Sequence, residues 1–267
     1  MSALPAPARA ALARVLQASS LAACVALWHL AASRRLKLGF ISFENVPVPS
    51  EVLSAAWALL QSPKLLQHLG ASLARIAVGF GLAAALGIAL GLAIGRSRWA
   101  RDTLLPPLEV LRPIPAVAWI PLAILIFPSS EGSMVFITFV GALFPVLLST
   151  VHGVEGVDPR LVASARSLGT GGWRLFTEVI APGAAPSIVT GLSIGMGTCW
   201  FCLVTAEMIS GQFGIGYYTW QSYVVQNYAN IVVGMLLIGV LGMGSSVLIR
   251  AAGRWAMPWY RPQGAAQ

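Results

Sequence analysis

Apolar segments long enough to cross a lipid bilayer recur along almost the whole chain. The 267 residues are 57% hydrophobic and only 10% charged, and the mean hydropathy is +0.78. A soluble domain carries about 25% charged residues, so this chain lacks the polar surface that a soluble enzyme or a nucleic-acid-binding protein needs. Because one spanning helix takes about 20 residues, the sequence has room for about five to seven spans. It therefore predicts an all-α polytopic membrane protein.

Six transmembrane helices are predicted from these segments. Their limits are about 16–32, 71–95, 104–127, 134–151, 187–206 and 231–249. The first segment could instead be a cleaved signal peptide ending near 31–33, but it is longer than the apolar core of a usual signal peptide, which favours a retained span. A short amphipathic pattern that begins at Pro49 predicts an interfacial helix with Ser50 as its N-cap. The third span is broken by prolines, namely Pro106, Pro107, Pro113, Pro115 and Pro121.

Small residues recur at every fourth position of the second and fifth spans. They are Gly79, Ala83, Gly87, Gly91 and Gly95 in the second span, and Gly191, Gly195 and Cys199 in the fifth. Helices in lipid associate through close packing, because no hydrophobic effect drives them together there. Both rows therefore predict close contact with a neighbouring helix.

The positive charge of the chain indicates its topology. There are 17 Lys and Arg residues against nine Asp and Glu, a net charge of +8. With six spans and the N-terminus inside, eleven basic residues fall on the cytoplasmic side: Arg9, Arg14, Arg96, Arg98, Arg101, Arg160, Arg166, Arg174, Arg250, Arg254 and Arg261. Four fall on the other side, namely Arg34, Arg35, Lys37 and Lys64, and the remaining two, Arg75 and Arg112, lie near span ends. Basic residues concentrate on cytoplasmic loops, so both termini are expected to be cytoplasmic.

The segment between the fourth and fifth spans, residues 153–183, predicts two short helices. Asp158 is a suitable N-cap, Pro159 suits the first helical position, and Gly169 suits a left-handed residue that ends a helix. A second helix is expected to begin near Gly172 and to stop before Pro182. Neither helix is long enough to span a bilayer. A hairpin rich in small residues suits docking into a groove of a partner protein.

In this segment the sequence resembles the membrane subunits of ABC importers. The pattern of that family is Glu-Ala-Ala-x3-Gly-x9-Ile-x-Leu-Pro, and it aligns with Ala163-Ser164-Ala165, Gly169, Val179 and Ala181-Pro182. This chain departs from the pattern where Ala163 replaces the glutamate, Ser164 an alanine and Ala181 the leucine. The missing glutamate affects any salt bridge from position 163 to the ATPase, but not the docking role.

Three further segments are similar to the subgroup that imports nitrate, taurine and alkanesulfonates. They are 111–115 with 118–125, 206–209 (Ala-Glu-Met-Ile) and 214–217 (Gly-Ile-Gly-Tyr). The resemblance implies a type I ABC importer transmembrane domain over 66–250. Residues 1–65 would then form an N-terminal span with an extracytoplasmic interfacial segment, and 251–267 a cytoplasmic tail.

The partners follow from the same resemblance. It implies a homodimer of this subunit, two cytoplasmic ATPase subunits and an extracytoplasmic substrate-binding protein, in the inner membrane of a bacterial cell. ATP and Mg²⁺ would be bound by the ATPase, with no cofactor in this chain. The sequence is consistent with this, because a Walker A loop needs Gly-Lys-Ser/Thr, and the only lysines, Lys37 and Lys64, follow Leu36 and Pro63. We therefore expect a transport subunit and not an enzyme.

Two groups of residues are candidates for function. The residues expected to dock the ATPase are Asp158, Arg160, Ala163, Ser164, Ala165, Arg166, Gly169, Trp173, Arg174 and Pro182. Candidates for the pathway or a gate are Glu207, Arg112 and Glu109. Glu207 could instead be a charge at the level of the lipid headgroups, and Arg112 could form a structural pair with Glu109, three residues away on the same helix face.

Two other classes of protein fit the sequence less well. An ion-coupled secondary transporter would need ionisable residues in the middle of its spans, and these are essentially absent. An intramembrane enzyme would need a catalytic constellation, whereas His29, His68 and His152 are scattered. Cys199 and Cys202 have zinc-like spacing but no second pair, so we expect core packing and no metal site.

Overall fold

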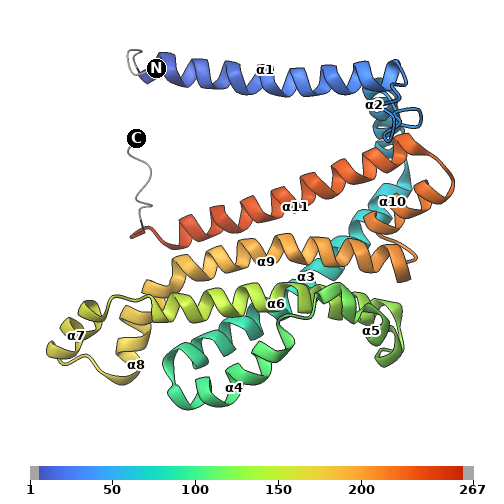
Figure 1. Cartoon of the computed structure of the whole chain (residues 1–267). Coiled ribbons are helices and arrows are strands. Elements are labelled where there is room, and N and C mark those ends of the chain that lie inside the picture. Colours follow the sequence, from blue (N-terminus) through green and yellow to red (C-terminus); the bar gives the residue numbers. More distant parts are fainter. Residues whose placement is uncertain (1–5, 261–267) are drawn as a thin grey trace. The chain divides into compact units, whose positions relative to one another are not determined.

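The computed structural model describes residues 6–260, and the side chains of residues 12–260. Residues 261–267 of the expected cytoplasmic tail and the side chain of Arg9 therefore lie outside the described part. Within that part the regular elements are helices, besides one isolated β-bridge between Lys37 and Ser42. The elements (Figure 1) are α1 (Ala6–Ser33), α2 (Pro49–Leu60), α3 (Pro63–Arg96), α4 (Arg98–Leu111), the 3₁₀-helix η1 (Ala116–Trp119), α5 (Ile120–Ile126), α6 (Ser130–Glu155), α7 (Pro159–Ser167), α8 (Gly172–Leu175), the π-helix η2 (Phe176–Ile180), α9 (Ala181–Ser210), α10 (Ile215–Val224) and α11 (Tyr228–Ala256).

Five helical segments are long and apolar enough to cross a membrane. They are Leu12–Ser33, Pro63–Arg96, Ser130–Glu155, Gly172–Ser210 and Tyr228–Ala256. A sixth candidate is the pair formed by Arg98–Leu111 and Ala116–Ile126, whose two halves are bent by 82°. The all-α membrane fold predicted from the sequence is confirmed.

The bend in the third predicted span has a local cause. Pro113 and Pro115 lie between the two halves, and a proline ring removes an N–H donor and clashes with the preceding helical turn. Pro106 and Pro107, by contrast, lie inside α4, which continues through them. The break is therefore located at residues 112–115.

The expected helix end before Pro182 is wrong. The chain stays helical from Gly172 to Ser210, and Pro182 lies in the first turn of α9. The π-helix η2 comes just before it, and the Ala181 N–H donates to the carbonyl of Phe176, five residues back. The π turn directly before Pro182 changes which carbonyls need a donor, and the helix continues past this proline, as α9 also continues through Pro186.

The predicted N-cap of the interfacial helix is also wrong by two residues. Val48 is the N-cap of α2, with Pro49 in the first helical position. The Val48 N–H donates to the carboxylate of Glu51 at 3.2 Å, so a side chain in the first turn satisfies the N–H of the N-cap residue.

The chain forms two compact units. The first unit contains Met1–Leu65 and Thr219–Met235, and the second contains Leu66–Tyr218 and Leu236–Gln267. The first unit thus includes a stretch that the sequence analysis placed in the transmembrane domain of 66–250.

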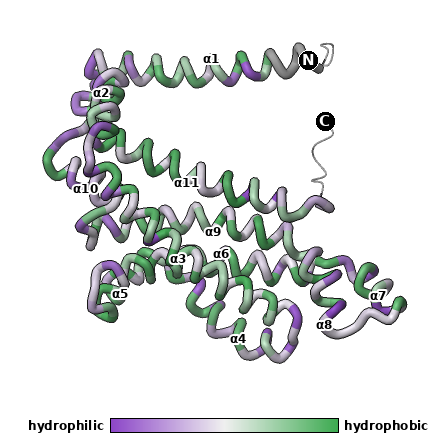
Figure 2. The backbone as a smooth tube through the Cα atoms, turned by 180° about the vertical axis from the view of Figure 1, so that it is seen from behind, coloured by the Kyte–Doolittle hydropathy of each residue, from purple (hydrophilic) through white to green (hydrophobic). Residues whose placement is uncertain are grey.

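In the second unit, α6 packs between α3 and α9, and Figures 1 and 2 show α6 and α9 running side by side. Both rows of small residues lie against α6. A Cβ atom built on Gly79, Gly91 or Gly95 of α3 would lie 2.5–2.8 Å from a Cβ atom of α6 (Thr138, Thr150 and Val154), and one on Gly87 would lie 3.1 Å from Val146. On α9, Gly191 and Gly195 approach Ser149 and Val146 of α6 equally closely. Contacts this close exclude larger residues, and they make α3, α6 and α9 one tightly packed group.

Candidate functional site

The loop after α6 has the geometry predicted for a docking hairpin. The Asp158 carboxylate accepts the Arg160 N–H at 2.8 Å and caps α7, whose first residue is Pro159. At the other end Gly169 has φ +82°, the Gly169 N–H donates to the Arg166 carbonyl, and the Thr170 N–H donates to the Ala165 carbonyl. These two bonds form a Schellman motif, which needs a left-handed residue at position 169. The N-cap and the C-terminal glycine predicted from the sequence are confirmed.

This hairpin presents apolar side chains to the outside. Leu161, Leu168 and Trp173 are 58%, 86% and 70% exposed. Leu175 is buried and holds α8 to the rest of the unit, and the Arg96 guanidinium lies 5.0 Å above the Phe176 ring, which joins the end of α3 to the loop. An exposed apolar group on an anchored support is typical of a protein-binding surface.

The residues predicted for docking lie on this hairpin. Arg160, Ala163, Ser164 and Arg166 are exposed on α7, Ala165 is half-buried on the same helix, and Arg174 on α8 donates to Glu178 at 3.3 Å. Pro182 is half-buried at the start of α9. Sequence reasoning missed Leu161 and Leu168, although their spacing of seven residues places them on one face of a helix.

A buried ion cluster lies in the same unit, at the opposite end of α9. The Arg75 guanidinium, 3% exposed, donates from Nη1 to Glu207 Oε1 at 2.8 Å and to the Phe213 carbonyl at 2.6 Å. Its other edge donates from Nε and Nη2 to the two carboxylate oxygens of Glu131, at 2.8 and 2.5 Å. Ser72 Oγ donates to Glu207 Oε1 at 2.7 Å. One cation thus joins α3, α6, α9 and the loop after α9.

The cluster also holds the beginning of α10. The Gly216 N–H donates to Glu207 Oε2 at 2.9 Å, and the Ile215 N–H donates to Ser72 Oγ at 2.9 Å. These are free donors of the first helical turn, where a carboxylate is favourable. Gly214 has φ +133°, and a Cβ atom there would collide with the Glu207 carboxylate. The structure therefore brings together two of the segments, 206–209 and 214–217, on which the subgroup resemblance rests.

Glu207 is fully buried, with no exposed side-chain surface. The reason is that the loop 211–216 folds back over the end of α9, which a hydropathy pattern does not reveal. The role of Glu207 as a pathway or gate residue stays a prediction. Sequence reasoning missed Ser72 and Arg75. The sequence does contain a signal for Arg75: it is an arginine within an apolar segment, and a charge in such a segment needs a buried partner.

Arg112 and Glu109 lie elsewhere. Both are exposed, Glu109 on α4 and Arg112 at its C-cap next to the proline break. Within the described part of the chain no ion pair within 4.0 Å joins them, so the expected structural pair does not form. Arg101 of α4 pairs with Glu155 at the end of α6 instead, at 2.8 Å.

The two cysteines of α9 are buried against α6. A Cβ atom on Gly141 would lie 2.6 Å from Cys202 Sγ, and Cys199 has no exposed surface. Among the residues described, no group of three or more His, Cys, Asp or Glu side chains could hold a metal ion.

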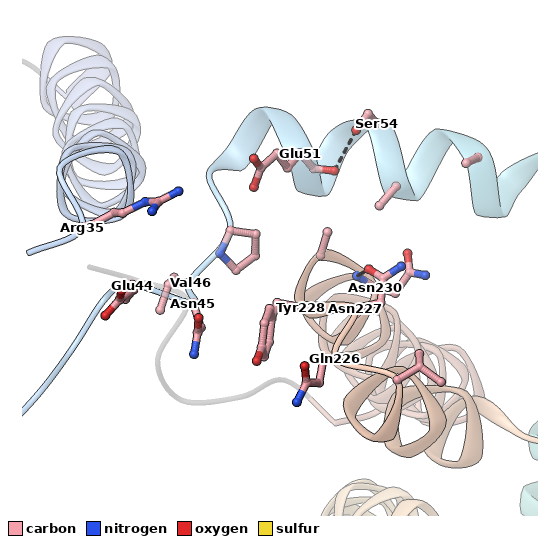
Figure 3. A pocket seen from close by; sticks show the side chains of 15 residues that line it. Arg35, Glu44, Asn45, Val46, Glu51, Ser54, Gln226, Asn227, Tyr228 and Asn230 are labelled. Carbon is pink, nitrogen blue, oxygen red and sulfur yellow. Dashed lines mark hydrogen bonds between the residues drawn. The ribbon is translucent and has the colours of Figure 1, made fainter.

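The first unit contains a polar pocket of about 820 Å³ (Figure 3). It is lined from three segments: the stretch after α1, the first turns of α2, and the turn between α10 and α11. Arg35, Glu44 and Glu51 supply charges, and Asn227 and Asn230 supply amides. A hydrogen bond from Lys37 and its positive charge hold the pKa of Glu44 below its usual value, so this carboxyl stays ionised. The pocket suits a polar partner.

Comparison with known proteins gives one family. The family described as "Binding-protein-dependent transport system inner membrane component" matches residues 83–262. This range includes the hairpin of α7 and α8 and Glu207.

Individual relatives match most of the chain. The "Putative aliphatic sulfonates transport permease protein SsuC" of Escherichia coli is 37% identical over 235 residues, 88% of each chain. The "Nitrate import permease protein NrtB" of Synechocystis sp. is 36% identical over 208 residues, 74% of this chain and 76% of the relative. A protein of Bacillus subtilis with the same printed name as the first is 32% identical over 238 residues, 89% of this chain and 85% of the relative.

Proposed function

Because the chain belongs to the family of binding-protein-dependent transport system inner membrane components, and is an ABC-transporter permease and not a catalytic subunit, we propose how it works in its complex. Two copies form the translocation pathway of an importer. Each copy docks one of two cytoplasmic ATPase subunits, and a separate binding protein delivers the substrate from the outside.

One observation carries this proposal: the hairpin of residues 153–183. A capped helix with an exposed apolar face is anchored through η2 to the start of α9, so a push on the hairpin is transmitted along one continuous helix. This is what an ATPase needs in order to convert its closure into movement of the spans. ATP and Mg²⁺ are proposed to bind to the ATPase, with no cofactor in this chain.

The orientation follows from the hairpin. If α7 faces the ATPase, six crossings place both termini in the cytoplasm, in agreement with the eleven basic residues assigned to that side. The polar pocket of Figure 3 then belongs to the extracytoplasmic surface and is available to the binding protein.

The substrate proposed is a small oxyanion such as a sulfonate, taurine or nitrate. The support is the printed names of the relatives, two for aliphatic sulfonates and one for nitrate. Glu207 and Arg75 are proposed to shape the outer end of the pathway by fixing α3, α9 and α10. Arg112 and Glu109, exposed beside the proline break, are proposed as pathway or gate residues.

The alternative, an ion-coupled secondary transporter, gains no support from the buried charges. Arg75 and Glu207 are paired with each other, and Glu207 lies three residues from the end of α9. They complete a structural cluster and do not form an open ion site in the middle of a span.

The test is reconstitution with the neighbouring gene products. A tagged chain should copurify with a second copy and with an ATPase, and substrate-loaded binding protein should stimulate ATP hydrolysis in liposomes. Transport driven by an ion gradient without any ATPase would contradict the proposal. The ligand that copurifies with the binding protein tests the substrate class.

A further inference from the structure

A groove of about 500 Å³ lies between the beginning of α9 and the last turns of α11, in the second unit. The two helices touch at its floor, because Gly253 of α11 is buried against the side chain of Val189 of α9. The groove is therefore bounded by two packed helices, and the turn that follows α11 completes it. Its lining includes Arg250, Arg254, Thr190 and Tyr260.

The groove carries positive charge without a counter-charge. Arg250 and Arg254 are one helical turn apart and both line it. In the part of the chain that the structure describes, neither arginine forms an ion pair, and the sequence has no Asp or Glu after Glu207. Two neighbouring guanidinium groups repel each other, so an anion that contacts both is bound favourably.

The surroundings of the two arginines have the composition of a membrane interface. Trp255 and Trp259 are 88% and 59% exposed, and large aromatic side chains concentrate at the level of the lipid headgroups. One turn earlier, Val247 and Leu248 expose 44% and 70% of their surface. The helix rises about 28 Å from Ile231 to Arg250, close to the thickness of the hydrocarbon core, about 30 Å.

We propose that this groove binds the headgroup of an anionic phospholipid, with Arg250 and Arg254 on its phosphodiester group and the acyl chains along Val247 and Leu248. Basic pockets between spanning helices are a recognised form of lipid site. The assignment to the cytoplasmic leaflet rests on the proposed function, which places α7, and hence this end of α9, on the ATPase side. The chemistry of the site does not depend on that orientation.

The test uses the purified full chain, stripped of lipid in a neutral detergent and titrated with phosphatidylglycerol or phosphatidylcholine, with bound lipid counted by native mass spectrometry. Wild-type protein should retain phosphatidylglycerol in preference to phosphatidylcholine. The double variant R250Q/R254Q should bind phosphatidylglycerol about 30-fold more weakly, because it removes two cations from the lipid contact. R34Q/K64Q removes the same charge elsewhere and should bind like wild type.

Two further measurements identify which part of the protein and which part of the lipid account for the binding. R250K/R254K keeps both charges and should retain most of the binding, which attributes a loss in R250Q/R254Q to the missing charges. Glycerol 3-phosphate offers the phosphate without acyl chains and should bind far more weakly than the lipid. Equal binding of glycerol 3-phosphate and lipid would assign the groove to a soluble phosphate and overturn the proposal.

Two results would contradict the lipid site directly. One is equal retention of both lipids by wild-type protein. The other is an R250Q/R254Q variant that keeps phosphatidylglycerol but no longer copurifies with the ATPase, which would make the groove a protein contact. Because the lipid titration contains no ATPase, its outcome is independent of whether the proposed transport complex forms.

Discussion

Arg75 shares one guanidinium between two carboxylates that differ sharply in exposure. The Glu207 side chain is completely buried, whereas that of Glu131 is 65% exposed. Loss of the Glu207 charge weakens the buried hydrogen bonds from Arg75, Ser72 and the Gly216 N–H, although Arg75 keeps Glu131. Water can replace part of what the exposed Glu131 carboxylate provides. The two halves of the cluster should therefore differ in their importance for stability.

We predict that Glu207→Gln lowers the free energy of unfolding by about 1–3 kcal/mol, the usual cost of a buried hydrogen-bonding group left unsatisfied, and that Glu131→Gln lowers it by less. Thermal unfolding of the purified protein in detergent, followed by Trp fluorescence, measures both. A stronger effect of Glu131→Gln would contradict the cluster as described. Uptake by assembled Glu207→Gln complexes tests separately whether the residue acts in the pathway.

Sequence reasoning at this scale found Glu207 but not its partners. Ser72 and Arg75 precede Glu207 by more than 130 residues, and only the fold-back of residues 211–216 brings the group together. An apolar pattern shows where a helix lies along the chain. It does not show which helices meet, so Arg75 was assigned to the end of a span.

The contact between α3 and α6 depends on glycine residues that let the two helices approach closely. Gly91 of α3 lies so near α6 that a Cβ atom would be 2.5 Å from Thr150 Cβ and 2.8 Å from the carbonyl oxygen of Leu147. The carbonyl belongs to the backbone of a helix and cannot move aside. A glycine elsewhere on α3, Gly81, has no atom within 4 Å of such a Cβ.

Gly91→Val should therefore separate α3 from α6 and lower the unfolding free energy by at least about 1–3 kcal/mol, the usual cost of overpacking. Gly81→Val introduces the same side chain into the same helix and should have little effect. The thermal unfolding midpoint and the fraction of monodisperse protein in size-exclusion chromatography compare the two. Equal behaviour would mean that α3 and α6 are not in contact as described.

The end of α7 gives a second prediction for an element. Gly169 needs φ +82°, a conformation that costs a residue with a Cβ atom roughly 1–2 kcal/mol and a β-branched residue more. Gly169→Val should therefore distort the hairpin and reduce ATPase copurification several-fold. Gly169→Asn, which tolerates this conformation, should retain it.

Gly171→Val is the matched control, because Gly171 has an extended backbone and open surroundings. It introduces the same side chain two residues away and should copurify like wild type. ATPase binding that is unchanged in Gly169→Val would show that the Schellman end of α7 is not needed for docking.

Helix ends were predicted correctly where the signal lies within a few residues of the end. Asp158, Pro159 and Gly169 mark the ends of α7 in the sequence and in the structure. Pro182 led to the wrong prediction of a helix end. The π turn directly before it keeps the chain helical, and no single residue type marks such a turn in the sequence. Five prolines were expected to break the third span, and only Pro113 and Pro115 lie at the break. The expectation is wrong for Pro106 and Pro107, because α4 continues through them, and Pro121 lies in the first turn of α5.

At the scale of the molecule, the central claim is that the hairpin of residues 153–183 is where the ATPase docks. The most direct measurement is photocrosslinking from a single photoreactive residue placed in the assembled complex. Position 168, where Leu168 is 86% exposed at the end of α7, is the test site. Position 125, where Leu125 is 83% exposed on α5, is the control. A crosslink to the ATPase is expected from position 168 and none from position 125. No ATPase crosslink from position 168 in a complex that still hydrolyses ATP, or an equal one from position 125, would contradict it.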